Sequence, residues 1–321
     1  MRRAGGIAFA ALLTGCAVGV EAPVASPVAE STFDGRLLVL EELGPPVISS
    51  LELDSGVSNP WYSLPSEAFA YELTSHPDRG VAVPYTPPPV DDGAAFDRVW
   101  VASLDADTQE ATRLACPDTQ GVQCFFPEWS ADGASLWFVE SGTLQDDDTH
   151  ALVRVDARSG QRTLVESMAT EPALGPGVAA WIAVHPKDGS RSLRVDRGKG
   201  PETLVEAGVF SDLGQPFVSA DGTWVGFVAL QPQVAGWGFV PTAHAHSDHA
   251  VAGDWWRIPV EGGAAEQITD LGVVFHDGDP SPDGRHLAVA TSTGVSVIDL
   301  ASGEATEVLT TRAARAVEWL E

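Results

Sequence analysis

A strand–turn–strand unit recurs along this chain, and the repeat restricts the possible folds more than any other feature of the sequence. Its clearest copies are FPEWSADGASLWFV at residues 126–139, QPFVSADGTWVGFV at 215–228 and DPSPDGRHLAVA at 279–290. In the turn, the Asp carboxylate can accept hydrogen bonds from nearby backbone amides and Gly tolerates a positive φ, so the pair predicts a tight hairpin. Repeats spaced tens of residues apart are typical of propellers and solenoids, in which no single unit buries its apolar faces alone.

A second hairpin follows each of these units. Six segments consist of a strand, a Gly-rich or polar turn and a short return strand, and they begin at Val47, Val99, Ala151, Ser192, Trp255 and Val295. A first hairpin precedes five of them, with less regular turns at residues 76–80 and 175–177. Strand runs broken by turn residues fill the chain, without long helical periodicity. The pattern predicts an all-β fold, a six-bladed β-propeller of four-stranded blades.

The two ends of the repeat region predict how the ring closes. The chain ends in AVEWLE at residues 316–321, which is similar to the PEWS strand at 127–130 but stops before any Asp-Gly turn. FDGRLLVL at residues 33–40 begins at Asp-Gly with no strand before it. Together they make one complete unit, so the C-terminal strand is expected to join the first blade. Such closure removes the unpaired sheet edges that open folds must protect.

With SPDGRHLAVA at residues 281–290 and its two SADG copies, the chain resembles the TolB-like, or PD40, family of six-bladed propellers, which is more distantly related to WD-repeat proteins. The pattern covers residues 33–321. The resemblance implies a propeller that presents one face to other proteins. It implies no particular reaction, because propellers host many unrelated functions.

The first residues predict a lipoprotein signal peptide. Arg2 and Arg3 form a positive start, and the apolar run at residues 4–12 is too short to span a bilayer as a helix. The run leads into Leu13-Thr14-Gly15-Cys16, which looks like a bacterial lipobox. Cleavage after Gly15 would leave Cys16 carrying the lipid. The alternative is an ordinary secretory signal with an incidental cysteine.

The segment after Cys16 predicts how the protein is attached and where. Residues 17–31 are small, Pro-bearing and aperiodic, which is typical of a flexible tether. The predicted organisation is therefore a signal peptide at 1–15, a lipidated cysteine and tether at 16–31, and a propeller at 32–321. Ala17, rather than Asp, follows the cysteine and favours the outer membrane, with the propeller facing the periplasm.

The charge of the chain excludes two classes of partner. Forty-five acidic and 18 basic residues give a net charge of −27, and loss of Arg2 and Arg3 with the signal peptide makes it more negative. Nucleic acids and anionic lipid surfaces both require positive charge. Membrane contact is therefore expected through the lipid on Cys16 alone.

The strands also carry tryptophans, and the mature chain keeps two cysteines. Trp100, Trp129, Trp137, Trp181 and Trp224 all lie in predicted strands and are expected to pack between blades. Cys116 and Cys124 would lie at the crossing from the second blade to the third. A structural disulfide is expected in an oxidising periplasm, since a catalytic thiol would need an activating base that the sequence does not indicate.

One insertion holds the residues best suited to chemistry. The string H-x-H-x-D-H at residues 244–249 matches the metal motif of the metallo-β-lactamase superfamily. That family needs an αββα fold and further His and Asp ligands, whereas this chain has only His276 and His286 left and resumes its repeat at Asp254. The family is therefore rejected. The local chemistry remains, because three imidazoles and a carboxylate could bind zinc or copper; they are His244, His246, Asp248 and His249. The alternative is an exposed polar loop.

The long insertions occupy equivalent positions in the repeat. Residues 86–98, 141–149 and 233–253 all connect a second strand to a third, so they are expected on one face together with the Cys116–Cys124 loop. The acidic runs at residues 91–92 and 146–148 do not have calcium-loop spacing and are interpreted as solvated loop tips. Asp277-Gly278-Asp279 is interpreted as part of a turn.

Two functions from different classes remain. The chain contains no G-x-S-x-G, P-loop, Rossmann fingerprint or C-x-x-C. The favoured hypothesis is a lipid-anchored scaffold that binds an envelope protein or a small ligand on the loop-bearing face. The alternative is a metal-dependent lyase or hydrolase acting on a sugar or lactone, with the insertion as metal site and Asp248 or His276 as base.

Overall fold

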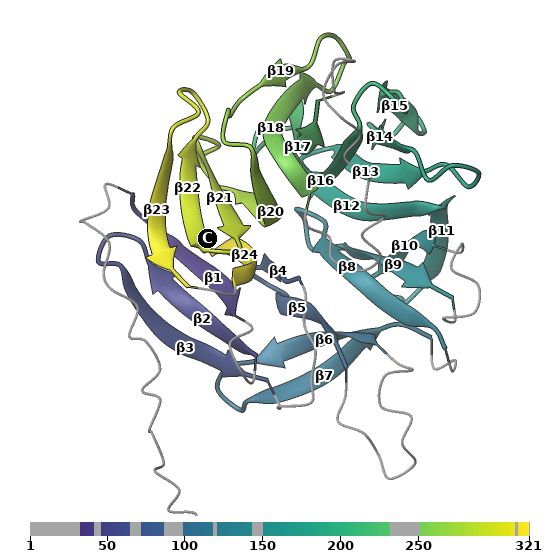
Figure 1. Cartoon of the computed structure of the whole chain (residues 1–321). Coiled ribbons are helices and arrows are strands. Elements are labelled where there is room, and N and C mark those ends of the chain that lie inside the picture. The colour runs from purple at the N-terminus through teal and green to yellow at the C-terminus, as the bar shows by residue number, and fades with distance from the viewer. Residues whose placement is uncertain are drawn as a thin grey trace, which may run out of the picture.

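The computed structural model describes residues 33–41, 46–64, 72–86, 99–117, 121–142, 150–231, 251–311 and 314–320. These residues form β-strands joined by turns, with no helix among them (Figure 1). The described part of the chain accordingly contains no helix able to cross a membrane.

Four sheets of the described residues contain four strands each. The first sheet is formed by β24 (Ala314–Leu320), β1 (Arg36–Glu41), β2 (Val47–Glu52) and β3 (Val57–Ser63). The second contains β4 (Thr74–His76), β5 (Gly80–Tyr85), β6 (Trp100–Asp105) and β7 (Glu110–Ala115). The third contains β8 (Gln123–Trp129), β9 (Ser135–Ser141), β10 (His150–Asp156) and β11 (Arg162–Ser167). The fourth contains β12 (Ala169–Gly175), β13 (Val178–Val184), β14 (Arg191–Asp196) and β15 (Glu202–Val205).

The remaining strands form one eight-stranded sheet, which differs from the predicted separate four-stranded blades. Its first part contains β16 (Asp212–Val218), β17 (Trp224–Leu230), β18 (Val251–Pro259) and the two-residue β19 (Glu266–Gln267). Its second part contains β20 (Val273–Pro280), β21 (His286–Thr291), β22 (Gly294–Asp299) and β23 (Ala305–Thr310).

The two parts join because β18 begins earlier than the repeat predicts. The expected strand starts at Asp254, where β17 pairs with β18 through Ala229, but the strand begins at Val251. The three extra residues extend beyond β17 and pair with β20, Val251 opposite Phe275 and Gly253 opposite Val273. The connection from β17 to β18 therefore spans residues 231–250 instead of the predicted 233–253.

The ends of the repeat region meet in the first sheet. Strand β24 pairs antiparallel with β1, with Trp319 opposite Leu37 and Val317 opposite Val39. Figure 1 shows this yellow C-terminal strand beside the purple β1. The two strands are distant in sequence, so the pairing gives the first sheet a strand from the far end of the chain.

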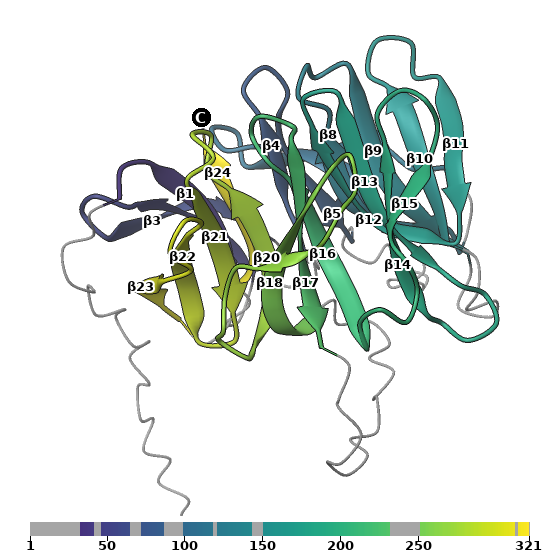
Figure 2. The same cartoon turned by 90° about the horizontal axis from the view of Figure 1, so that it is seen from above.

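The sheets surround a common centre in Figure 1, and Figure 2 shows the same sheets from a view turned by 90°. Each run of four strands begins with an inner strand, and each inner strand contacts the next; in order around the centre they are β4, β8, β12, β16, β20 and β24. The contact of β24 with β4 completes the circle. This closed arrangement of antiparallel sheets is a β-propeller.

The Asp-Gly turns of the repeat form the hairpins that the sequence predicts. Asp132 accepts hydrogen bonds from the Ala134 amide at 3.0 Å and the Ser130 hydroxyl at 2.7 Å, and Gly133 has a φ of 60°. These hydrogen bonds hold the pKa of Asp132 below its usual value, with the Ala134 amide the largest cause. Because Asp221 and Asp283 make the same kind of contacts, the repeated motif is explained by turn formation.

Tryptophans fill much of the space between sheets, as predicted, with two exceptions. Trp181 is fully buried and lies 6.4 Å from Trp137 of the neighbouring sheet, measured between ring centroids. Trp129 is also buried. Trp100 and Trp224 are only half-buried, and the Arg113 guanidinium covers the Trp100 ring at 5.0 Å.

Candidate functional site

Several predicted site residues lie outside the described part of the chain. They are Cys16, the possible metal ligands His244, His246, Asp248 and His249, and the acidic runs at 91–92 and 146–148. Lipidation of Cys16 and metal binding by the insertion therefore stay predictions. Within the described ranges, no three His, Cys, Asp or Glu side chains form a group that could hold a metal ion.

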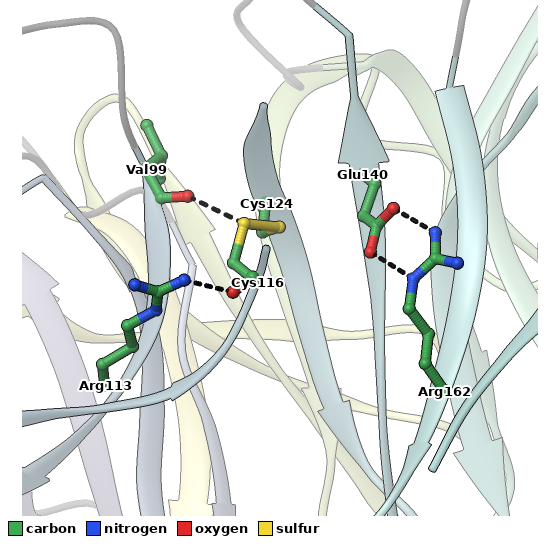
Figure 3. The surroundings of a disulfide bond; sticks show 6 residues. All are labelled: Val99, Arg113, Cys116, Cys124, Glu140 and Arg162. Atoms are coloured by element: carbon green, nitrogen blue, oxygen red, sulfur yellow. Dashed lines mark hydrogen bonds and ion pairs between the residues drawn. A yellow bond between two sulfur atoms is a disulfide. The ribbon is translucent and has the colours of Figure 1, made fainter. Parts of the chain in front are cut away.

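Cys116 and Cys124 are joined by a disulfide, with an S–S distance of 2.09 Å and a Cα–Cα distance of 6.0 Å (Figure 3). Cys116 directly follows β7 of the second sheet, and Cys124 belongs to β8 of the third. The Val99 carbonyl accepts the Cys124 amide at 3.0 Å, and the Arg113 guanidinium donates to the Cys116 carbonyl. The bond therefore ties two neighbouring sheets together, and nothing in its contacts suggests catalysis.

Carboxyl side chains gather around the centre of the propeller. We call the following six residues the axial carboxyls: Glu72, Glu128, Glu171, Asp277, Asp279 and Glu318. Five lie on inner strands, and Glu72 lies two residues before β4. The charge of Glu72 interacts with Asp277 on β20 and Glu171 on β12, which are not its neighbours around the circle. The group therefore faces a common centre.

Three axial carboxyls occupy one repeat position. Glu128 pairs across its hairpin with Trp137, Asp279 with Ala288, and Glu318 with Leu38. Glu128 and Asp279 each lie one residue before the last residue pair of their hairpin. Glu318 lies one residue before the last pair but one. The three side chains therefore lie near the same end of their strands.

Each axial carboxyl accepts a backbone amide from the next inner strand. Glu318 Oε1 accepts the Ser75 amide of β4 at 2.7 Å, and Glu72 Oε2 accepts the Phe126 amide of β8 at 2.8 Å. Glu128 accepts the Leu174 amide of β12. These bonds join successive sheets from the first to the fourth.

The same pattern continues around the rest of the circle. Glu171 Oε2 accepts the Gln215 amide of β16 at 2.5 Å, and Gln215 donates through Nε2 to the Phe275 carbonyl of β20 at 2.9 Å. Asp277 Oδ2 accepts the Val317 amide of β24 at 3.0 Å, and Asp279 Oδ2 accepts the Trp319 amide at 2.7 Å. Side chain to backbone hydrogen bonds therefore link every inner strand to the next.

Two of these bonds support strained backbone. Phe126 and Gln215 have φ values of 53° and 49°, in the left-handed region that non-glycine residues rarely adopt, and each precedes a proline. Both lie where the pairing register shifts at a β-bulge. The carboxyls of Glu72 and Glu171 accept the amides of these same residues, so they hold the bulges in place.

Burial raises the pKa of all the axial carboxyls. It raises the pKa of Asp277 to about 7 and that of Asp279 to about 8, against the opposing effect of the amides they accept. The pKa values of Glu72, Glu128 and Glu318 are well above the usual range for the same reason. These side chains are half-buried, and the loss of solvating water disfavours their charged form.

The pKa of Glu171 is raised too, again by burial first. Arg191 Nη1 lies 3.4 Å from Glu171 Oε1 and opposes the rise. Carboxyls with raised pKa values are common in acid–base catalysis but also in structural networks. Here the oxygens are bonded to backbone amides of the scaffold, so the geometry favours a structural role.

The sequence interpretation of Asp277 and Asp279 as turn residues is wrong. Both lie in β20 and bond to β24, because the hairpin turn begins only after Pro280. A signal for the carboxyl position was present: Glu precedes Trp in both PEWS at 127–130 and VEWL at 317–320. Glu72 and Glu171 have no such shared neighbours.

Two grooves lie between sheets. One, of about 580 Å³, separates the third sheet from the fourth, and its lining includes Trp137, Arg154, Gln161, Thr163 and Gly198. The other, of about 730 Å³, lies between the two parts of the eight-stranded sheet, and its lining includes Gln231, Asp254, Thr269 and Ser302. Gln231 and Asp254 stand close to the two ends of the histidine-rich insertion in sequence.

No protein-family model matches the chain, and no curated protein matches it significantly. Among solved structures, it is similar to TolB from Acinetobacter baumannii, with 16% identity and a TM-score of 0.64 over 89% of this chain. This chain spans 66% of the length of that protein. It is also similar to a protein described as TolB from Agrobacterium tumefaciens, with 12% identity and a TM-score of 0.60 over 90% of this chain and 100% of the other. At these identities the likeness concerns the fold, and this chain has a TolB-like β-propeller fold.

Proposed function

We propose that this protein is a lipid-anchored β-propeller of the bacterial cell envelope that binds a protein or a small ligand on its loop-bearing face. We infer six blades for it. That number is supported by the six inner strands in mutual contact, each followed by three further strands.

The observation that carries the proposal is the common position of three long connections, each of which joins a second strand to a third. Residues 86–99 join β5 to β6, residues 142–149 join β9 to β10, and residues 231–250 join β17 to β18. In an antiparallel sheet, every connection from second to third strand leaves from the same side, so the anchors of all three share one face. Variable connections on a rigid scaffold are where binding residues concentrate.

Two further features support an exported, anchored protein. The Leu13-Thr14-Gly15-Cys16 string and the tether after it favour lipidation at Cys16. The Cys116–Cys124 disulfide suits an oxidising compartment such as the periplasm.

The anchor is tested with the full chain expressed in a diderm bacterium beside a Cys16→Ser variant. Metabolic labelling with an alkyne fatty acid should label the wild-type protein, which should fractionate with the outer membrane. The variant should lose the label and the membrane association. Equal labelling of both proteins would contradict lipidation at Cys16.

The binding face is tested in the same cells with a photo-crosslinking amino acid placed at single positions. Gly142 and Gln231 stand at the loop-bearing face, whereas Ser159 and Ala220 stand in exposed turns of the opposite face. Discrete crosslinked products should form from the first pair and not from the second. Crosslinked products from Ser159 and Ala220 alone would contradict the proposed binding face.

The alternative of a metal-dependent lyase or hydrolase depends on the histidine-rich insertion. Elemental analysis of protein purified without a His tag, beside a variant with His244, His246 and His249 replaced by Ala, tests it directly. Near-stoichiometric zinc or copper that the variant loses would favour that alternative.

A further inference from the structure

Strand β24 is held in the propeller in two different ways. On one side it pairs with β1 through backbone hydrogen bonds. Toward the neighbouring inner strands, Asp277 and Asp279 of β20 accept its Val317 and Trp319 amides. Its own Glu318 accepts the Ser75 amide of β4. Two uncharged contacts add to these: the Trp319 indole donates to the Asp279 carbonyl at 2.9 Å, and the Ser75 hydroxyl donates to the Trp319 carbonyl at 3.3 Å. The attachment of this strand to both neighbours therefore uses three axial carboxyls.

These three groups stand close enough to affect one another. The charges of Asp279 and Asp277 disfavour ionisation of Glu318, and the charge of Asp277 disfavours ionisation of Asp279. Glu128 adds a further negative charge from β8. Ionisation of all of them would place several negative charges in a poorly solvated centre, where like charges repel strongly.

Other titratable groups lie on β4, β20 and β24 and on the strands near them. On the inner strands or just before them they are Glu72 before β4, His76 on β4, Glu128 on β8, Glu171 on β12, His276 on β20 and Arg315 on β24. On β1, β16, β21 and β22 the charged residues stand at the strand ends; they are Arg36, Glu41, Asp212, His286 and Asp299. On β18, Asp254 bonds to the Leu271 and Gly272 amides, and Arg257 pairs with Glu266.

We propose that Asp277, Asp279 and Glu318 form a proton-controlled latch on the closing strand β24. When they are protonated, the strand is held against β20 and β4. When they lose their protons together, repulsion among the carboxylates loosens the strand from both neighbours. The inference goes beyond the proposed binding function and does not depend on it.

The direction of the pH effect follows from proton linkage. A carboxyl whose pKa is higher in the folded than in the unfolded protein binds more protons when folded, so stability falls as pH rises between the two values. An unfolded Asp has a pKa of about 3.9, and the folded values of Asp277 and Asp279 are about 7 and about 8. The contribution of these two groups to the stability of the protein is therefore greatest below about pH 4 and is lost progressively up to about pH 8.

The turn aspartates titrate below most of this pH window. The turn aspartates, among them Asp132, Asp221 and Asp283, have pKa values below the usual range because turn hydrogen bonds favour their charged form. Their stabilisation develops as pH rises through the acid range and is complete by about pH 5. Burial also raises the pKa values of Glu72, Glu128 and Glu171, so measurements between about pH 5 and about pH 8.5 report on all the axial carboxyls and on any coupled histidine. A variant that changes latch residues alone separates their share.

The first test is urea unfolding of the protein beginning at Ala17 across this pH range. The unfolding equilibrium constant of the wild-type protein should rise at least about tenfold from the acid to the alkaline end. Asp279→Asn combined with Glu318→Gln keeps oxygen acceptors for the two amides and removes two charges. The unfolding equilibrium constant of this double variant should therefore change much less with pH. Glu206→Gln, at an exposed position, serves as the matched control and should keep the wild-type slope.

A second measurement needs no variant. Hydrogen exchange of the wild-type segment 314–320, corrected for the intrinsic pH dependence of exchange, should lose protection toward alkaline pH more than β13, which lies far from the latch. Wild-type stability that is constant or rises with pH would overturn the proposal. So would a double variant that keeps the full slope, or uniform loss of protection in both segments.

Discussion

At the residue scale, the axial carboxyls show how a strongly acidic chain uses charge-bearing side chains inside its own fold. Glu171 is the clearest single case, because its side chain is only 4% exposed. It accepts the Gln215 amide and pairs with the Arg191 guanidinium, so it connects the fourth sheet to β16. A buried group with such contacts is costly to truncate, since its partners lose an acceptor that water cannot replace.

Replacement of Glu171 by Ala should lower the free energy of unfolding by about 2–3 kcal/mol, because both contacts are lost. Glu171→Gln keeps an oxygen for the Gln215 amide and should cost less, about 1 kcal/mol. Urea unfolding at constant pH measures both. Equal losses in the two variants would show that the charge, rather than the hydrogen bond, is what matters at this position.

Sequence reasoning at this scale succeeded for turns and failed for the carboxyls. The Asp-Gly turns were predictable because all their hydrogen bonds run within a few residues, as Asp132 shows with Ser130 and Ala134. The axial carboxyls bond to amides of another sheet, for example Glu318 to Ser75, 243 residues away. Only the closed ring brings such partners together, so local patterns do not reveal them.

At the element scale, the hairpins agree with the repeat, and the departures have local causes. Even the two irregular turns close hairpins, with His76 opposite Gly80 and Gly175 opposite Val178. The join between β18 and β20 was not predicted, because it depends on three residues at the end of an insertion that lie beside β20 only in the folded molecule. The repeat identifies strands but not contacts between neighbouring sheets.

The disulfide acts between elements, since it ties the end of β7 to β8. Replacement of both Cys116 and Cys124 by Ser should lower the free energy of unfolding by about 2–3 kcal/mol, the value expected for closing a short loop in the unfolded chain. Urea unfolding of the variant and of the oxidised wild-type protein measures the difference. An unchanged midpoint would show that packing between the two sheets makes the bond redundant.

At the scale of the whole molecule, closure joins the two ends of the propeller in one sheet. The repeat and its split copy predicted this pairing, since the missing first strand of one unit stands at the end of the chain. The sequence could not predict that carboxyls would attach the closing strand to both of its inner neighbours. The binding face follows from closure as well, because a rigid ring fixes the relative positions of connections that are far apart in sequence.

The most direct test of this description is removal of the closing strand. Protein beginning at Ala17 is compared with the same protein ending at Ala313, which lacks β24, by urea unfolding and by hydrogen exchange of β1. Loss of β24 should expose the β1 edge, remove the bonds to β4 and β20, and lower stability sharply, with loss of protection across the first sheet. A truncated protein that unfolds at the wild-type midpoint, with β1 still protected, would contradict a propeller closed by its C-terminal strand.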